Sequence, residues 1–100
     1  EILWAQTDKY VGKILFVEAG KRLSLQYHKE KDETIYLESG KVNIEIDGMK
    51  VQLEPGGSVR IAPSVKHRIE ALEDSKLFEV STPELNDVVR LEDDYDRVSK

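Results

Sequence analysis

The chain has 100 residues, 39% of them hydrophobic and 35% charged, with a net charge of -5 and no cysteine. This length is typical of a domain with one core, so we expect a single domain over residues 1–100. The acidic balance excludes the basic face of a nucleic-acid-binding protein, and the lack of cysteine excludes disulfides and catalytic thiols.

Short apolar stretches separated by turn residues follow one another along the chain. Residues 1–7 predict an edge strand, and residues 10–18 predict a second strand. Within the second strand, Ile14–Val17 is apolar without interruption, as expected of a strand that is buried on both faces or lies at a subunit interface. Further strands are predicted over residues 22–28, 33–38, 41–46, 49–53, 58–61, 67–71 and 76–81.

Turn residues agree with an all-β chain. Asp47-Gly48 lies between two predicted strands and is a strong signal for a two-residue hairpin, because such a turn needs positive φ at both positions. Strands separated by turn signals every roughly 8–12 residues predict a sandwich or barrel. After Pro83 the periodicity weakens, and we expect a short irregular or helical tail with room for one helical turn over residues 83–89.

The segment from Gly20 to Gly40 carries three residues that can bind a metal. Alternation puts Gln26 and His28 on the same side of a strand, and Glu33 opens the next strand after a charged turn. We expect a hairpin to bring Glu33 back beside His28. His67, the only other histidine, follows a Gly/Pro-rich turn at the head of another strand. Each residue alone is more often a solvated or hydrogen-bonded side chain, but two histidines placed in this way favour a common site.

The spacing of these residues resembles the first sequence motif of the cupins. Gly20, Gln26, His28, Glu33 and Gly40 keep every spacing of that motif, with Gln26 in place of its first histidine. The resemblance implies an antiparallel jelly-roll β-barrel, also called a double-stranded β-helix.

The second cupin motif is matched less completely. Gly56 and His67 keep their places, whereas Ala62, Ser64 and Ala71 replace the proline, glycine and asparagine of the motif. We therefore expect a differently shaped turn before His67.

Within the cupins, the segment Leu23–His28 resembles the mannose-6-phosphate isomerase branch, including the isomerase domain fused to mannose-1-phosphate guanylyltransferases. Asp96 departs from this branch, which usually has glycine there. The further positions that resemble the branch are Lys13, His67, Arg68, Val89–Asp93, Tyr95 and Arg97.

The resemblance implies that Gln26, His28, Glu33 and His67 bind one divalent transition metal. Two imidazoles, a carboxylate and an amide oxygen suit Zn²⁺, which we expect first, and also Mn²⁺, Fe²⁺, Co²⁺ or Ni²⁺. Such a metal keeps open positions for water or substrate, which is the condition for Lewis-acid chemistry.

Three functions follow from this ligand set. The first is an isomerase that interconverts aldose and ketose phosphates, with Lys13 as a candidate catalytic group and arginines as candidates for the phosphate site. The second is a non-haem oxygenase that uses only His28, Glu33 and His67, although Gln26 counts against it. The third is a non-catalytic domain that binds a sugar or a metal. The candidate phosphate-binding residues are Arg60, Arg68 and Arg90, with Arg97 further along the tail.

The expected partner is a small sugar or sugar phosphate, with no nucleic acid and no membrane. No apolar run approaches the roughly 20 residues of a membrane span and no signal peptide is evident, so we expect a cytoplasmic location. The first residue is Glu1 instead of methionine, which indicates a trimmed or truncated N-terminus. Ile2–Trp4 and Ile14–Val17 are more hydrophobic than a small monomer easily covers, which predicts a homodimer.

Overall fold

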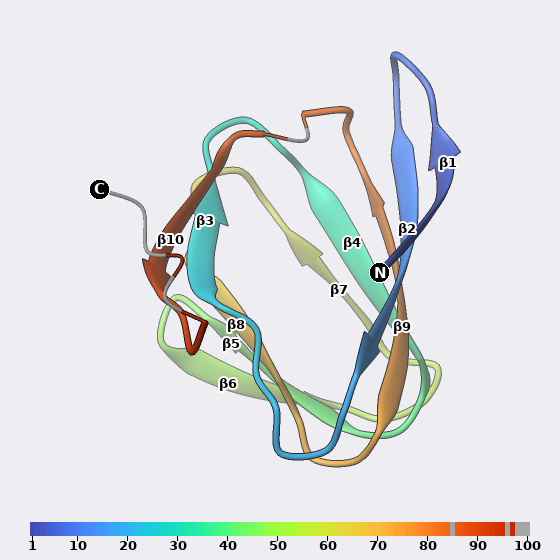
Figure 1. The fold of residues 1–100 in the computed structure, drawn as a ribbon, viewed down its shortest axis with the longest axis vertical. Helices are drawn as coiled ribbons and strands as arrows, with labels where there is room; N and C mark the ends of the chain where they lie inside the picture. Colours follow the sequence, from blue (N-terminus) through green and yellow to red (C-terminus); the bar gives the residue numbers. More distant parts are fainter. Residues whose placement is uncertain (85, 96, 98–100) are drawn as a thin grey trace.

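The computed structural model describes residues 1–84, 86–95 and 97, so Asp96 lies outside the described residues. Within this part of the chain the secondary structure is entirely β-strand (Figure 1), and no helix is long and apolar enough to cross a membrane. The ten strands of these residues are β1 (Ile2–Gln6), β2 (Val11–Val17), β3 (Leu25–His28), β4 (Glu33–Ser39), β5 (Val42–Ile46), β6 (Met49–Leu53), β7 (Ser58–Ile61), β8 (His67–Ala71), β9 (Ser75–Ser81) and β10 (Val88–Glu92).

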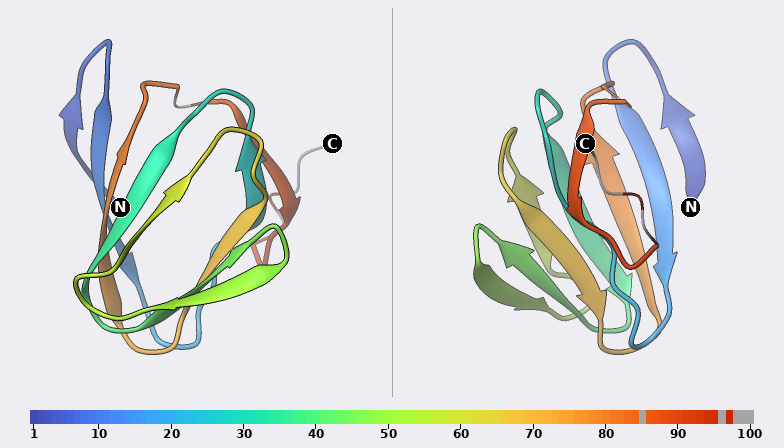
Figure 2. Two further views of the ribbon diagram at one scale, coloured as in Figure 1. Left: turned by 180° about the vertical axis from the view of Figure 1, so that it is seen from behind. Right: turned by 60° about the vertical axis from the view of Figure 1, so that its left-hand side comes forward.

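Two antiparallel sheets build the fold, which confirms the predicted jelly roll. Sheet A has the strand order β1-β2-β9-β4-β7, and sheet B has the order β10-β3-β8-β5-β6. The sheets curve around a shared interior (Figure 2), so each strand presents alternate side chains to it. The apolar core residues come from both sheets and are Leu15, Val17, Ile35, Leu37, Val42, Ile44, Leu53, Ile61, Ile69, Ala71 and Leu77.

Strand β4 shows how sequence alternation chooses the inner face. Ile35 and Leu37 point into the core and are buried, whereas Tyr36 between them lies on the outer face and is partly exposed. Glu33 has the same parity as Ile35 and Leu37, so it is carried into the interior with them. The burial of apolar neighbours on one strand thus places a carboxylate inside the barrel.

The apolar run in β2 is divided between the two faces of sheet A. Leu15 and Val17 are buried in the core, whereas the side chain of Phe16 lies on the outer face and is 58% exposed. The strand is therefore not buried on both faces within one chain.

The predicted hairpin at Asp47-Gly48 joins β5 to β6. Asp47 has φ 48° and Gly48 has φ 83°, as the two-residue turn requires. Ile46 and Met49 are consequently paired across the end of the hairpin.

The hairpin predicted between β3 and β4 is wrong. Strand β3 pairs with β8 and β10 in sheet B, whereas β4 pairs with β7 and β9 in sheet A. The connecting turn crosses between the sheets and is held by Asp87, whose carboxylate accepts backbone hydrogen bonds from Glu30 at 2.7 Å and Lys31 at 3.0 Å. Glu33 therefore faces His28 across the barrel interior instead of along a ladder.

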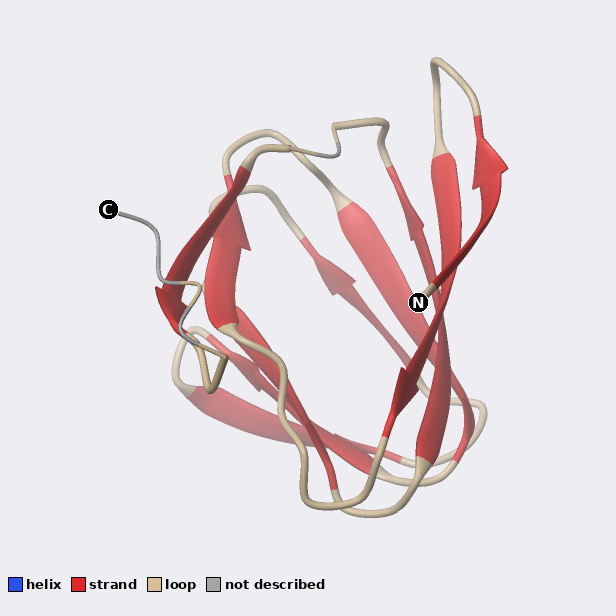
Figure 3. Ribbon diagram, viewed as in Figure 1, coloured by secondary structure: helices blue, strands red, loops and turns tan. Residues whose placement is uncertain are grey.

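The C-terminal tail contains a strand where the sequence predicts irregular or helical structure (Figure 3). Strand β10 adds to the edge of sheet B, with Val88 opposite His28 and Arg90 opposite Gln26. The free backbone groups of the β3 edge supply its hydrogen-bond partners, which is a tertiary cause that local propensity does not contain.

Candidate metal centre

Three buried side chains converge inside one end of the barrel. His28 ends β3, Glu33 begins β4 and His67 begins β8, and they are 6%, 3% and 3% exposed. One potential ligand atom from each residue lies within 4.8 Å of the other two. Glu33 Oε1 is 3.1 Å from His67 Nε2 and 3.6 Å from His28 Nε2. The structure thus brings together three of the four residues predicted to bind a metal.

The hydrogen bond made by Nδ1 of His67, the ring nitrogen that faces away from Glu33, determines the tautomer of this histidine. His67 Nδ1 lies 2.9 Å from the carbonyl oxygen of Val65, so Nδ1 carries the proton and donates it. Nε2 is then the ring nitrogen that faces Glu33. His28 is oriented in a similar way, with Nδ1 3.4 Å from Asp87 Oδ1. Two imidazole nitrogens and a carboxylate oxygen that face each other are a donor set that fits a transition metal.

Gln26, the fourth predicted ligand, lies beside this cluster. It is opposite His67 in the β3–β8 pair, and its Nε2 is 3.3 Å from His28 Nε2. Its Oε1 accepts a hydrogen bond from the buried hydroxyl of Ser24. Because an amide presents oxygen or nitrogen after a half-turn about its last bond, Gln26 can offer Oε1 to a metal by exchanging these two contacts.

Burial and the neighbouring groups shift the pKa of Glu33 in opposite directions. Burial by itself raises the pKa of this carboxyl, but hydrogen bonds from His28 and His67 and the nearby ammonium of Lys31 hold the pKa well below its usual range. Glu33 therefore stays ionised, as a metal ligand must be.

Two further buried charged residues, Lys31 and Glu79, lie next to the centre. Lys31 Nζ is 3.3 Å from Glu79 Oε2 and 3.4 Å from Glu33 Oε2. Burial, followed by repulsion from Glu33, raises the pKa of Glu79 to about 7. Sequence analysis missed both residues. Glu79 lies two residues after the buried Leu77 on the same strand, and this alternation could have predicted its burial. Lys31 lies in a charged turn, where no sequence pattern predicts burial.

A cavity of about 320 Å³ opens on the ligand side of His28 and Gln26. Half of the polar residues that line this cavity are basic, namely Lys13, Lys31, Arg90 and Arg97. Lys13 Nζ is 3.2 Å from Glu1 Oε1, and Arg90 is carried to this wall by its pairing opposite Gln26. Two of the residues predicted from sequence to act on a ligand, Lys13 and Arg90, therefore line the same cavity as His28 and Gln26.

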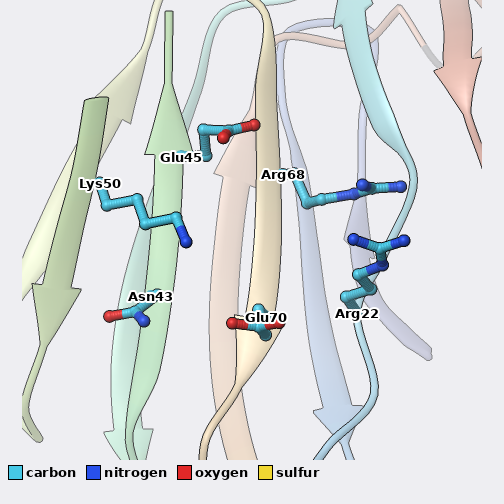
Figure 4. Close-up of a pocket in the computed structure, with 6 residues that line it drawn as sticks. All are labelled: Arg22, Asn43, Glu45, Lys50, Arg68 and Glu70. Carbon is cyan, nitrogen blue, oxygen red and sulfur yellow. The ribbon is translucent and has the colours of Figure 1, made fainter. Parts of the chain in front are cut away.

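The other two predicted ligand-binding residues, Arg60 and Arg68, lie outside this cavity. Arg60 is exposed and forms a two-pronged ion pair with Asp32. Arg68 donates from Nε to the carbonyl oxygen of Leu23 at 2.9 Å and from Nη2 to that of Glu92 at 3.3 Å. These contacts tie β8 to the segment before β3 and to β10. Arg68 lines a shallow pocket of about 80 Å³ whose residues are of mixed charge (Figure 4), namely Arg22, Asn43, Glu45, Lys50, Arg68 and Glu70.

Three solved structures that resemble this chain belong to proteins named for different functions. KdgF from a Halomonas species has a TM-score of 0.80 and 24% identity, over 85% of this chain and 78% of that chain. A proposed sugar phosphate isomerase from Acidithiobacillus ferrooxidans has a TM-score of 0.69 and 20% identity, over 78% of this chain and 52% of that chain. Salicylate 1,2-dioxygenase from Pseudoaminobacter salicylatoxidans has a TM-score of 0.71 and 16% identity, over 74% of this chain and 20% of that chain.

A search of curated proteins finds no match to the chain. At these identities the structural likenesses show the fold alone. The cupin domain family matches residues 13–81, which include Gln26, His28, Glu33 and His67. Because this match spans more than half of the chain, the protein belongs to the cupin domain family.

Proposed function

We propose that this cupin uses one divalent transition metal, zinc in the first place, to bind a small anionic sugar derivative. The observation that carries the proposal is the convergence of His28 Nε2, His67 Nε2 and Glu33 Oε1 beside a basic cavity. The hydrogen bond from His67 to Val65 leaves Nε2 facing the carboxylate of Glu33, where one metal ion can bind both groups. Gln26 is the proposed fourth ligand.

The charges of the cavity indicate the class of ligand. Lys13, Lys31, Arg90 and Arg97 line it, and an array of ammonium and guanidinium groups favours phosphate or carboxylate. The resemblance of Leu23–His28 to the mannose-6-phosphate isomerase branch supports a sugar phosphate. The proposed name of one structural neighbour, a sugar phosphate isomerase, is compatible with that choice.

The proposed reaction is the interconversion of an aldose phosphate and a ketose phosphate. A metal at this centre would supply Lewis-acid polarisation of the sugar oxygens. Arg90 and Arg97 are proposed to hold the phosphate, and Lys13 is proposed to carry the proton that moves between the two carbons. Arg60 and Arg68 have no part in this proposal, because they lie outside the cavity.

Calorimetry on zinc-loaded protein tests the ligand class, with mannose 6-phosphate, fructose 6-phosphate and GDP-mannose as the compounds. Binding of at least one with a Kd below about 1 mM supports the proposal. Binding of none of them contradicts it. A coupled isomerisation assay with the ligand that binds then separates turnover from binding without reaction.

A metal-dependent oxygenase is the second candidate. The observation in its favour is that His28, Glu33 and His67 alone form the buried cluster, which is the two-histidine-one-carboxylate set of non-haem iron oxygenases. In the structure the Gln26 oxygen is engaged by Ser24 and not by this cluster. Oxygen uptake by iron-loaded protein in the presence of an aromatic acid supports this candidate, whereas isomerisation by the zinc form excludes it.

We further propose that the protein is a homodimer and that sheet A provides the interface. Ile2, Ile14, Phe78 and Tyr36 occupy one cross-strand row of this sheet, and all lie on its outer face. Tyr36 and Phe78 stack with their ring centroids 6.2 Å apart. Over β5, β6 and β8 the outer face of sheet B instead carries charged and polar residues (Figure 4), which suit solvent.

The exposed apolar area on sheet A is close to what a stable dimer uses. Trp4, Phe16 and Tyr36 are 55%, 58% and 40% exposed, and Ile2 and Val80 are about half exposed. These five side chains present on the order of 400 Å² of apolar surface. A standard interface buries roughly 800 Å² per partner, of which somewhat more than half is apolar. The proposed partner is a second copy of the same face, which also carries Lys76, with its Nζ 5.9 Å from the Phe16 ring centroid and 5.5 Å from the Phe78 ring centroid.

A further inference from the structure

Lys31 is a buried lysine that neither binds the metal nor belongs to the apolar core. It is 5% exposed and lies in the turn that crosses from β3 to β4. Lysine is rarely buried in proteins unless it is paired, because removing an ammonium from water costs several kcal/mol. Here the pairing is with Glu79 Oε2 at 3.3 Å and with Glu33 Oε2 at 3.4 Å.

The two oxygens of Glu33 have different surroundings. Oε1 faces His28 and His67, the two other members of the metal cluster. Oε2 points away from them toward the Lys31 ammonium. A carboxylate can bind a metal through one oxygen or through both, and a cation fixed beside the second oxygen opposes the two-oxygen mode.

We propose that Lys31, anchored by Glu79, is a positioning residue that holds Glu33 as a one-oxygen metal ligand. The inference rests on the proposed metal site and adds to it. With Oε2 retained by Lys31, the coordination position that this oxygen would take would stay open for water or a ligand. Lys31 also lines the cavity, so its ammonium adds to the positive charge around a ligand anion in that position.

Glu79 has a defined part in this arrangement. It stands opposite Lys13 in the β2–β9 pair and opposite Ile35 in the β4–β9 pair, on a strand with neighbours on both sides. Its carboxylate therefore comes from a rigid central strand, whereas Lys31 comes from a turn. The strand anchors the ammonium, and the ammonium in turn orients the metal ligand.

Cobalt substitution tests the proposal, since the visible absorption of Co²⁺ reports its coordination number and anion binding perturbs it. The variants are Lys31→Met, which removes the ammonium, Lys31→Arg, which restores a cation, and Lys29→Met, an exposed lysine in the same turn. We expect Lys31→Met to bind cobalt with a spectrum of higher coordination number. The affinity of this variant for inorganic phosphate, measured by following the cobalt spectrum during a phosphate titration, should be at least tenfold lower than that of the wild type. Lys31→Arg should recover most of both properties, and Lys29→Met should match the wild type.

A Lys31→Met spectrum and phosphate affinity equal to those of the wild type overturn the proposal. Should that variant fail to fold, Glu79→Gln carries the same test, because it keeps the side-chain size and replaces the carboxyl group that contacts Lys31. It should shift the spectrum in the same direction, and an unchanged spectrum would refute the role of Lys31. Cobalt uptake by the wild type tests the metal site itself, so failure of the site and failure of the Lys31 role are distinguishable.

Discussion

His67 is oriented by a hydrogen bond to the backbone. The carbonyl oxygen of Val65 accepts the Nδ1 proton and leaves Nε2 directed at Glu33. The turn residues before His67 therefore determine more than its position. They also choose which nitrogen is available to a metal.

We expect His67→Ala to lose the metal and to keep the fold. A deleted ligand should weaken metal binding by more than the 10–100-fold that is typical of outer-shell changes. The barrel persists because its core is made of apolar residues from both sheets, with Leu37 and Leu77 fully buried. Elemental analysis after gel filtration measures the metal, and circular dichroism measures the fold.

Gln52→Ala is a suitable control for His67→Ala, because Gln52 is exposed on β6 and contacts only Glu54 among the polar contacts of the described residues. It should retain one metal per chain. Full metal occupancy in His67→Ala would show that this histidine is not a ligand.

Strand β9 is the central element of sheet A. It pairs with β2 along its whole length on one side and with β4 on the other. Its inner face carries Leu77 in the core and Glu79 beside the metal centre. One strand thus connects the stability of the barrel to the geometry of the site.

Leu77→Ala should lower the free energy of unfolding by about 2–5 kcal/mol, because it leaves a cavity at a fully buried position. Leu72→Ala is the matched control. Leu72 is 41% exposed, so its truncation should cost less than about 1 kcal/mol. Urea unfolding of the three proteins measures both changes, and equal losses for the two variants would contradict the assigned core.

Strand β10 is the element that carries Arg90 to the cavity, and an ion pair helps to hold the chain beyond it. Asp94 accepts hydrogen bonds from Arg22 at 2.9 and 3.0 Å. This guanidinium, through its hydrogen bonds and its charge, holds the pKa of the Asp94 carboxyl below its usual range. A carboxyl whose pKa is lower in the folded state stabilises that state above its unfolded pKa, and the stabilisation is lost as the pH falls through the folded pKa.

We therefore expect β10 to lose amide protection in acid, below about pH 4, before the central strands do. Hydrogen exchange followed by NMR measures the protection of Val89 and Leu91 against that of Ile35 on β4. In Asp94→Asn the β10 amides should be less protected at neutral pH and should change less on acidification. An identical acid response in Asp94→Asn and the wild type would rule out this ion pair as the cause.

For the whole molecule, the main contrast is between the outer faces of the two sheets. Sheet A presents aromatic and aliphatic side chains, whereas sheet B presents charged and polar ones over β5, β6 and β8. In an isolated chain both faces are exposed to water. Exposure of the apolar face is unfavourable, and a second subunit that covers it would remove this penalty.

Light scattering should give a mass about twice that of the 11.4 kDa chain. Phe16→Asp should produce the monomer, because it places a charge in the centre of the proposed interface. Met49→Asp is the control, since Met49 is 73% exposed on sheet B and should leave the dimer intact. A wild-type mass near that of one chain at micromolar concentration would exclude the dimer.

Local patterns in the sequence were sufficient to predict most strands and to group three of the candidate metal ligands. Alternation of apolar residues placed nine strands, because the burial of one face of a strand is decided by neighbours two residues apart. The Asp47-Gly48 hairpin followed from the backbone freedom of those two residues. The spacing of His28, Glu33 and His67 pointed to one cluster, and the structure brings these three together.

Only the tertiary structure shows how the strands pair and which charged side chains meet. Nothing local distinguishes a β3–β4 hairpin from a crossing between sheets, because the choice depends on contacts such as those of Asp87 with the turn backbone. Strand β10 exists because β3 offers a free edge, and Lys31 is buried because Glu79 arrives from a strand far along the chain. Arg60 and Arg90 look alike in sequence, yet only Arg90 reaches the cavity. Long-range pairing determines which charges meet, and no local pattern encodes that.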